Sequence, residues 1–365
     1  MGSLYSFGFN AFGQVDPDSN QKEATHHDVS NVLFTTWEST VISTGTGELQ
    51  RWGYQPIQDS GSSFTALTDW GDRCIRRMFG DLNLCLGAVD DQGNVWYRVL
   101  GSSTTNPIQL LASEAQDAVY CSALEAIYVL TVDGNVDHYK MQKEDDKVAF
   151  KLVARLATLP RVYSLAASAT HVLFYTAGMD PIYSLGSNRF SQLGFDTSSI
   201  QALATPTPID YFSGLGMMMD PDHQGMVACG LFHSAVVLGG ELYTFGWNKD
   251  GRLGWGDNDN DDNDVISPAV FLDAKGDPIQ EDISIVRVAC GAAHTLAMDD
   301  HGRIWSCGSN KYGQLGRKTS WQCQEIGNQD NNDDHDTAFR LVTILPPESY
   351  AKNCFTGRWS SFILM

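Results

Sequence analysis

Short apolar segments recur along the whole chain, and each is bounded by glycine or by a cluster of polar residues. Residues 182–187, 242–246 and 304–309 are examples, and such segments either alternate apolar and polar positions or are apolar throughout. Both patterns are typical of short β-strands. An apolar pattern with the period of an α-helix is not sustained in any part of the sequence, so the pattern predicts an all-β fold.

One sequence phrase repeats: an apolar strand, a glycine, an asparagine two positions later, and a turn that ends in Leu-Gly or a close variant. The clearest copies span residues 4–10, 182–188, 242–248 and 304–310. Aligned on the glycine, seven copies fall at positions 8, 53, 99, 140, 186, 246 and 308, although positions 99 and 140 carry other residues. A repeat of about 40 to 60 residues suits one small antiparallel sheet that packs against its neighbours.

A second phrase lies between these strands and reads as a short strand, a tight turn and another strand. Its copies place a histidine at one position, in His171, His233 and His294. The chain begins with the glycine phrase at residues 4–8 and ends with the other half of a repeat at residues 358–364. These halves complete one repeat if they pair. The sequence therefore predicts a seven-bladed β-propeller, a single domain over residues 1–365, closed by pairing of the N-terminal strand with the C-terminal blade.

Two polar regions lengthen the later repeats, and they predict loop insertions near residues 255–282 and 318–337. The first contains the most acidic run of the chain, with Asp257, Asp259, Asp261, Asp262 and Asp264. The run is interpreted in three ways: a solvated insertion, a loop that docks a basic partner surface, or a calcium site. Its spacing lacks the central glycine and the distal glutamate of an EF-hand loop, which weakens the calcium interpretation.

The formal net charge is -20, and the sequence pI is near 4.6. An acidic surface repels phosphate backbones, so we expect no direct binding of nucleic acid. No 18-residue apolar run exists, and the N-terminal residues lack a basic stretch followed by an apolar one, so we expect no membrane span and no secretory signal. We expect a cytoplasmic and/or nuclear protein whose eight cysteines are free thiols, since no pair has zinc-site spacing.

Sequence motifs for catalysis are absent. No phosphate-binding glycine loop and no nucleophile elbow occurs. The recurring histidines fall at equivalent positions of different repeats, so they are not expected to converge on one metal ion; hydrogen bonds to neighbouring segments are the preferred interpretation. We therefore predict no catalytic residue, no metal ligand and no cofactor. A propeller enzyme would instead require a cluster of His, Glu and Tyr side chains on one face.

Aromatic residues flank the turns of several repeats. Aromatic side chains at the rim of a propeller often anchor a protein interface, although packing between blades is the competing interpretation. Together with the acidic run, they make up the predicted protein-binding residues, namely Phe9, Phe12, Tyr54, Trp247, Trp255, Asp257, Asp259, Asp261, Asp262 and Asp264.

The two repeated phrases, Leu-Tyr-x-Phe-Gly-x-Asn with Gly-Gln-Leu-Gly, and Cys-Gly-x-x-His, resemble the regulator-of-chromosome-condensation repeat family. The resemblance covers essentially the whole chain and is weakest in the third and fourth copies. It implies a seven-bladed propeller that binds proteins. The opening phrase at residues 7–14 and residues 37–39 resemble the small single-propeller members.

The resemblance implies three kinds of partner. One group of single-propeller members partners a jumonji-domain histone-modifying hydroxylase, which the opening phrase favours. The alpha-tubulin suppressor group partners a small zinc protein in tRNA wobble-uridine modification and diphthamide synthesis. The founding member is a guanine-nucleotide exchange factor for the small GTPase Ran and carries a basic N-terminal tail, which this acidic sequence lacks. We therefore expect a non-enzymatic scaffold or regulatory subunit, a monomeric propeller within a hetero-complex.

Overall fold

The computed structural model describes residues 2–16, 25–54, 64–81, 84–100, 107–144, 147–218, 225–256, 264–317, 334–347 and 349–365. Regular structure in these ranges consists of β-strands and five short 3-10 helices, η1 (Thr68–Trp70), η2 (Ser122–Leu124), η3 (Asp210–Phe212), η4 (Leu215–Met218) and η5 (Lys249–Gly251). The chain divides into two compact units. Unit 1 comprises Met1–Leu67 and Ala235–Met365, and unit 2 comprises Thr68–Ser234.

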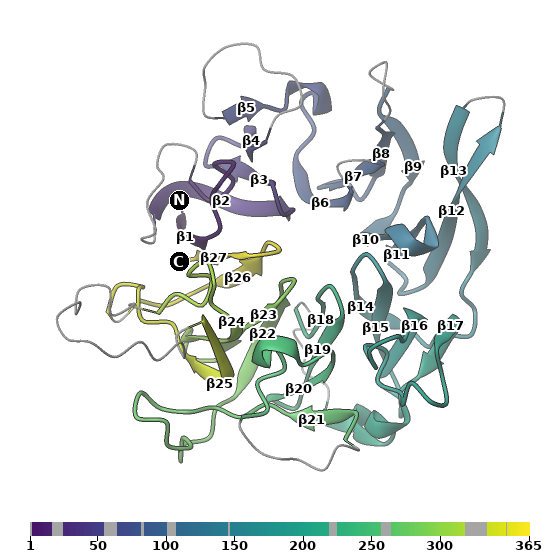
Figure 1. The fold of residues 1–365 in the computed structure, drawn as a ribbon. Helices are drawn as coiled ribbons and strands as arrows, with labels where there is room; N and C mark the ends of the chain where they lie inside the picture. The colour runs from purple at the N-terminus through teal and green to yellow at the C-terminus, as the bar shows by residue number, and fades with distance from the viewer. Residues whose placement is uncertain are drawn as a thin grey trace. The chain divides into compact units, whose positions relative to one another are not determined.

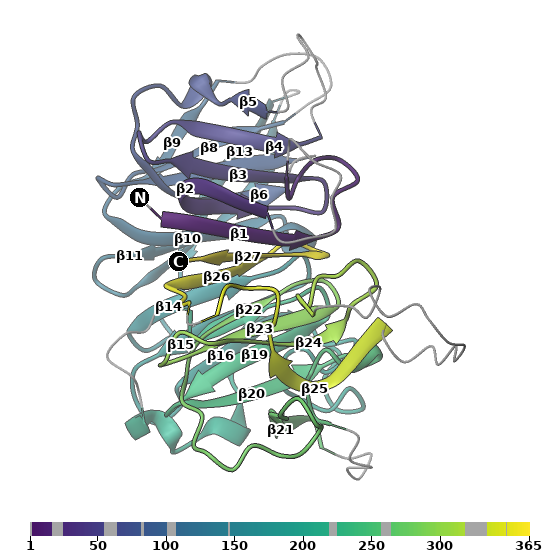
Figure 2. The same cartoon turned by 90° about the vertical axis from the view of Figure 1, so that its left-hand side faces the viewer.

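Unit 1 contains a seven-stranded sheet in which the two ends of the chain meet (Figures 1 and 2). Its order is β26 (Asn353–Thr356), β27 (Ser360–Leu364), β1 (Gly2–Gly8), β2 (Thr25–Thr35), β3 (Ser39–Thr44), β4 (Leu49–Gly53) and β5 (Phe64–Ala66). β1 pairs antiparallel with β27 from Leu4, opposite Leu364, to Gly8, opposite Ser360. The N-terminal strand thus completes the C-terminal repeat, as the split phrase predicted.

The paired strands form six sheets, so the prediction of seven blades is wrong. The physical reason lies in β2, which has eleven residues. Its first part pairs with β1 and its second part pairs with β3, with Val29 taking part in both pairings. Strands that the repeats assigned to two separate blades are therefore joined into one hydrogen-bonded sheet.

The remaining five sheets have four strands each, in sequence order. Unit 1 holds β22 (Ile285–Cys290), β23 (His294–Asp299), β24 (Ile304–Ser309) and β25 (His335–Leu341). Unit 2 holds β6 (Ile75–Asp81), β7 (Cys85–Asp90), β8 (Val95–Val99) and β9 (Gln109–Ala112); β10 (Ala115–Cys121), β11 (Ala126–Thr131), β12 (Val136–Glu144) and β13 (Lys147–Arg155); and β14 (Val162–Ala167), β15 (His171–Thr176), β16 (Ile182–Ser187) and β17 (Ala202–Pro208). The sixth sheet is β18 (Val227–Cys229), β19 (His233–Leu238), β20 (Glu241–Gly246) and β21 (Ile266–Pro268), and the chain passes from unit 2 to unit 1 within β19.

The central strands of the sheets are buried on both faces. All six side chains of β15 and all six of β23 are buried. Such strands read as continuous apolar runs because neighbouring sheets cover both of their faces. Part of the first predicted insertion is ordered, since it contains β21 and a bridge between Leu272 and Pro278. The region near residues 318–337 falls mostly outside the described residues.

Two predictions from composition can be compared with the described residues. Seven cysteines are free thiols there, and only Cys74 is exposed, whereas Cys323 lies outside the described residues. Burial raises the pKa of the Cys85 thiol to about 12. In the described part of the chain, no helix has the length and apolar character needed to cross a membrane.

Candidate protein-interaction site

A buried asparagine organises the turn that follows β16 in unit 2. Its Oδ1 atom accepts a hydrogen bond from the Leu193 N–H at 2.9 Å, and its Nδ2 atom donates to the carbonyl oxygens of Phe195 at 2.8 Å and Ile200 at 2.7 Å. This residue, Asn188, is fully buried. The Oε1 atom of Gln192 accepts a hydrogen bond from the Phe190 N–H at 2.8 Å. Two side chains thus satisfy backbone groups that have left the strand pairing.

The same arrangement recurs in unit 1 after β24 and after β1. Asn310 Oδ1 accepts from the Leu315 N–H at 3.0 Å, and Asn10 Oδ1 accepts from the Val15 N–H at 2.8 Å. The following glutamines accept hydrogen bonds from the backbone N–H groups of Tyr312 and Phe12, at 2.9 and 3.0 Å respectively. The repeated phrase therefore builds a rigid turn and holds an aromatic residue at one fixed position in it.

Aromatic rings from these turns form a continuous group in unit 1, called here the turn-aromatic cluster. Its members are Phe9, Phe12, Trp37, Tyr54, Tyr312 and Trp359. The ring of Phe12 lies 5.2 Å from that of Trp37, 6.1 Å from that of Tyr54 and 6.1 Å from that of Phe9, centroid to centroid. Phe9 in turn lies 4.9 Å from Tyr312 and 6.0 Å from Trp359. All five pairs have the edge-to-face geometry that aromatic rings prefer.

Half of the turn-aromatic cluster is open to solvent. Phe12, Trp37 and Tyr54 are 36%, 39% and 47% exposed, and the other three rings are half-buried. Phe12 lies centrally, because it touches rings from three different turns. A group of large, rigid side chains that remains partly exposed has the composition of an interface anchor. Burial of these rings by a partner would remove apolar surface from water without ordering flexible side chains.

The structure brings together three of the predicted aromatic residues, Phe9, Phe12 and Tyr54. Trp37, Tyr312 and Trp359 also belong to the cluster and were not predicted from the sequence as binding residues. Tyr312 could have been found, because it occupies the position of Phe12 in its own copy of the repeated phrase. Trp37 and Trp359 belong to the second phrase, and no pattern in the sequence shows that the two phrases meet at this point.

The described ring contacts do not link Trp247 or Trp255 to the turn-aromatic cluster. Trp247 is half-buried and lies against the side chains of Arg252, at 4.9 Å, and Lys249, at 5.6 Å. Trp255 donates a hydrogen bond from Nε1 to Thr244 Oγ1 at 2.8 Å and forms a backbone bridge with Ala338. Trp255 is half-buried, and a binding role for it remains a prediction.

The predicted acidic residues lie almost entirely beyond the described ranges. Asp257, Asp259, Asp261 and Asp262 are outside the described residues, and Asp264 is exposed. The structure therefore leaves the acidic run as a prediction.

The recurring histidines form hydrogen bonds inside their units. In unit 2, His171 Nε2 lies 2.8 Å from Ser234 Oγ, and that hydroxyl donates to the Gln192 carbonyl at 2.7 Å. In unit 1, His294 Nε2 lies 3.1 Å from Ser361 Oγ. Burial lowers the pKa of both His171 and His294 to about 3, so both rings are neutral near pH 7. Their roles are structural, in agreement with the interpretation from sequence.

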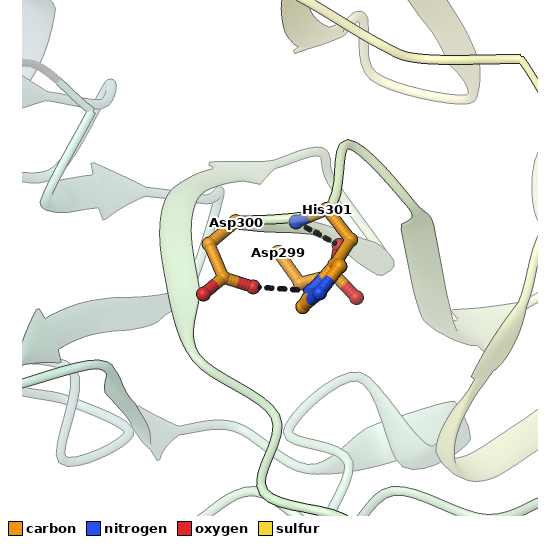
Figure 3. Close-up of side chains that lie close together, drawn as sticks. All are labelled: Asp299, Asp300 and His301. Atoms are coloured by element: carbon orange, nitrogen blue, oxygen red, sulfur yellow. Dashed lines mark hydrogen bonds and ion pairs between the residues drawn. The ribbon is translucent and has the colours of Figure 1, made fainter.

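The turn between β23 and β24 brings three potential metal ligands together, Asp299, Asp300 and His301 (Figure 3). Asp299 is buried and already accepts four hydrogen bonds, from the backbone N–H groups of His301 and Arg303, from Arg303 Nε and from Trp305 Nε1. His301 Nδ1 lies 2.7 Å from Asp300 Oδ1.

The same turn occurs between β7 and β8. There the Asp90 carboxylate accepts hydrogen bonds from the backbone N–H groups of Gln92 and Asn94 and from Trp96 Nε1. Both aspartates therefore stabilise a hairpin turn, and each accepts a hydrogen bond from a tryptophan of the next strand, Trp96 or Trp305. Hydrogen bonding by this carboxylate accounts for the grouping around Asp299 without a metal ion.

The sheets define the class of this protein as an all-β propeller. The regulator of chromosome condensation (RCC1) repeat matches residues 239–298 and 301–333, and a second model of the same repeat matches residues 285–314. The chain therefore contains regulator-of-chromosome-condensation repeats in this region.

Three known proteins illustrate the relationship. The E3 ubiquitin-protein ligase HERC2 of Mus musculus is 33% identical over 229 residues, which cover 61% of this chain but 4% of that protein. RCC1 domain-containing protein 1 of Mus musculus is 27% identical over 87% of this chain and 88% of its own length. The crystal structure of Prp20p from Saccharomyces cerevisiae, described with its binding properties to Gsp1p and histones, covers 100% of this chain and 91% of that chain, with a TM-score of 0.67 at 14% identity.

Proposed function

We propose that this protein is a non-enzymatic scaffold or regulatory subunit that binds a partner protein through the turn-aromatic cluster. The observation that carries the proposal is the group of six linked rings, of which Phe12, Trp37 and Tyr54 are exposed. Rigid turns hold the rings before a partner arrives, which lowers the entropic cost of binding. The described residues supply hydrogen-bonded structural roles for the histidines and for Asp299, so catalysis has no positive support.

A chromatin-modifying jumonji-type hydroxylase is the partner that we prefer. The support is the opening phrase at residues 7–14, together with the match to RCC1 domain-containing protein 1 along nearly the whole of both chains. A catalytic subunit of that kind would act in the nucleus or cytoplasm while this chain positions it. A small zinc protein of the tRNA-modification and diphthamide pathway is the alternative partner from the resemblance.

Quantitative affinity purification from a eukaryotic lysate tests the proposal. Four baits are compared: the wild-type chain, the Phe12→Ala variant, the Tyr54→Ala variant and the control variant Tyr211→Ala. Tyr211 lies in unit 2 and is 49% exposed, close to the 47% of Tyr54, so the control removes the same kind of side chain from an equally open position.

We expect the aromatic variants to weaken recovery of one specific partner by about 30-fold, corresponding to about 2 kcal/mol for an interface anchor. The Tyr211→Ala variant should behave as the wild type. Equal recovery with all four baits would remove the turn-aromatic cluster from the interface. Identification of a jumonji hydroxylase or of a small zinc protein would choose between the two partners.

Guanine-nucleotide exchange is a second candidate function, because the founding member of the family that the repeated phrases resemble is an exchange factor. The Prp20p structure, whose description includes binding to Gsp1p, covers the full length of this chain. At 14% identity that likeness carries the fold alone. The test is release of a fluorescent guanine nucleotide from a Ran-type GTPase in the presence of the purified chain. Acceleration that disappears in the Phe12→Ala variant would make exchange the function of the cluster, and unchanged release would reject it.

A further inference from the structure

The outer strand of one sheet in unit 2 is unusually open. β13 is the last strand in the order β10, β11, β12, β13, and Figure 1 shows it paired with β12 as a long hairpin. Residues 151–155 of this strand are all exposed. They include Leu152 and Val153, which are 58% and 53% exposed, although both are aliphatic side chains. An exposed apolar edge strand is a template on which another strand can pair.

Other described outer strands are protected against such pairing. β9 has four residues and β21 has three, while β17 carries Pro206 and Pro208, which cannot donate hydrogen bonds to a neighbouring strand. β25 is covered, since its residues Ala338 and Phe339 are buried and form bridges with Trp255 and Phe271. β13 has nine residues and no proline.

The hairpin that presents this edge is firmly anchored. Phe150 of β13 is buried and makes edge-to-face contacts with Tyr97, at 5.4 Å, and Tyr120, at 6.0 Å. Its backbone N–H donates to the Tyr97 hydroxyl at 3.4 Å. The open half of β13 therefore starts one residue beyond a fixed point in the core, and a partner strand would meet a preformed edge.

The open edge is positively charged in a protein whose net charge is -20. Lys140, Lys143, Lys151 and Arg155 are exposed on the two strands. Lys140 of β12 stands directly opposite Lys151 of β13 in the sheet register, and like charges in that position destabilise a sheet. Asp137 of β12 stands opposite Arg155 of β13, and both of its oxygens accept hydrogen bonds from Arg155, at 2.7 and 3.0 Å.

We propose that β13 binds an extended segment of a partner protein by strand addition, and that this segment alternates acidic and aliphatic residues. Main-chain hydrogen bonds to the free edge would supply affinity, and alternate side chains would supply specificity. No residue of β13 is acidic, so carboxylates of the partner would lie beside its basic positions Lys151 and Arg155. Aliphatic side chains on the other face of the partner segment would pack against the apolar positions of β13. The site lies in unit 2 and does not depend on the turn-aromatic cluster.

The probe is a fluorescein-labelled peptide of alternating Glu and Val, titrated with the full chain and followed by fluorescence anisotropy. Two control peptides replace every Glu with Lys, or every second Val with Pro. Hydrogen exchange of the complex measures which backbone amides the peptide protects. Protein variants are Leu152→Glu and Lys151→Glu, with Leu110→Glu as the matched control, because Leu110 lies on the outer strand β9 and is 52% exposed.

We expect the Glu-Val peptide to bind, to protect amides of β13, and to bind more weakly as salt rises. The variants Leu152→Glu and Lys151→Glu should each weaken binding by about tenfold or more, and Leu110→Glu should not. Protection of amides outside β12 and β13, or equal binding of the Lys-Val or the proline peptide, would overturn the proposal. Stronger binding of single-stranded DNA at the same amides, or self-association through β13, would overturn it as well. These results are independent of the variants' folding, because the peptides and the exchange pattern are measured on the wild-type chain.

Discussion

The connection that follows β16 and the connection that follows β12 occupy the same place in their repeats but have different structures. After β16, the buried Asn188 organises a turn, and the chain reaches β17 only at Ala202. After β12, two residues separate Glu144 from Lys147, the first residue of β13. Gln142 stands where Asn188 stands in its repeat. Without the asparagine turn, β12 and β13 form a hairpin of two nine-residue strands.

The two connections therefore produce two kinds of surface. Asparagine turns shorten the outer strand and display an aromatic ring, which in unit 1 leads to the turn-aromatic cluster. The hairpin of β12 and β13 displays an open, basic strand edge instead. Divergence of the fourth copy from the repeated phrase thus marks a local change of structure within an otherwise regular fold.

The largest expected effect concerns the glycine that the regular repeats share. Gly186 has a φ of +116°, and a Cβ atom built on it would lie 2.5 Å from the Thr170 carbonyl oxygen and 2.8 Å from the His171 Cα. We expect Gly186→Ala to lower the free energy of unfolding by about 3 kcal/mol or more, because backbone atoms block the new methyl group. Urea unfolding followed by circular dichroism measures the change.

Gly178→Ala is the matched control, since Gly178 also has a positive φ, +97°, but has no atom within 4 Å of its Cβ position. The Gly178→Ala variant should lower the free energy of unfolding by about 1 kcal/mol, because only backbone strain opposes the new methyl group. Equal losses in the two variants would show that conformational strain, and not close approach of two strands, explains the glycine. The fourth copy carries Lys140 at the same position and has no positive φ there, so it provides the natural comparison.

The next effect concerns the turn itself. Asn188→Ala removes three hydrogen bonds and leaves buried backbone groups without partners, so we expect a loss of about 2 to 3 kcal/mol in the free energy of unfolding. Asn135→Ala is the control, because Asn135 lies exposed in the tight turn before β12. Its loss should stay below about 0.5 kcal/mol. A similarly small loss for Asn188→Ala would mean that the turn forms without the asparagine, and the contrast with the β12–β13 hairpin would need another cause.

The smallest expected effect is a pH dependence that is strongest in the regular repeats. His171 and His294 have a folded pKa of about 3, lowered mainly by burial, against an ordinary value of about 6.5. The unfolded chain binds more protons between these values, so stability is complete above about pH 6.5 and falls as the pH drops. When the pH falls from 7.5 to 5.5, protonation of each histidine in the unfolded chain should lower the free energy of unfolding by about 1.3 kcal/mol.

Hydrogen exchange at the two pH values measures where the loss occurs. Faster opening at pH 5.5 should appear around β15 and β23, while the sheets from β6 to β13, which carry Cys85 and Ala126 at the histidine position, should change less. A His171→Gln variant should lose its share of the pH dependence. Uniform loosening of all sheets would assign the acid sensitivity to other groups.

Much of the architecture could be predicted from local patterns. The repeated phrase identified the strands, the all-β class and the pairing of β1 with β27, because each copy carries its own turn residues. The number of separate blades could not be predicted. It depends on β2, whose eleven residues pair on both sides, and hydrogen bonding between distant segments decides whether two sheets stay apart or join.

The candidate site also contains residues that local sequence could predict and residues that only tertiary contacts bring in. Phe9, Phe12 and Tyr54 could be identified from their place beside the repeated turns, whereas Trp37 and Trp359 joined the cluster only through tertiary contacts. Trp255 was also predicted from its place beside a turn, but its described contacts are with Thr244 and Ala338 and not with the cluster, so its role in binding stays a prediction.

The sequence by itself determined where each strand and turn forms, because glycine, asparagine and the apolar period act over a few residues. It also determined that the chain is acidic and carries no catalytic motif. Only the tertiary structure decided which aromatic rings meet, how many sheets are separate and which strand edge stays open. Those features depend on contacts between segments that lie far apart in the chain, and a local sequence pattern does not specify which distant segments meet.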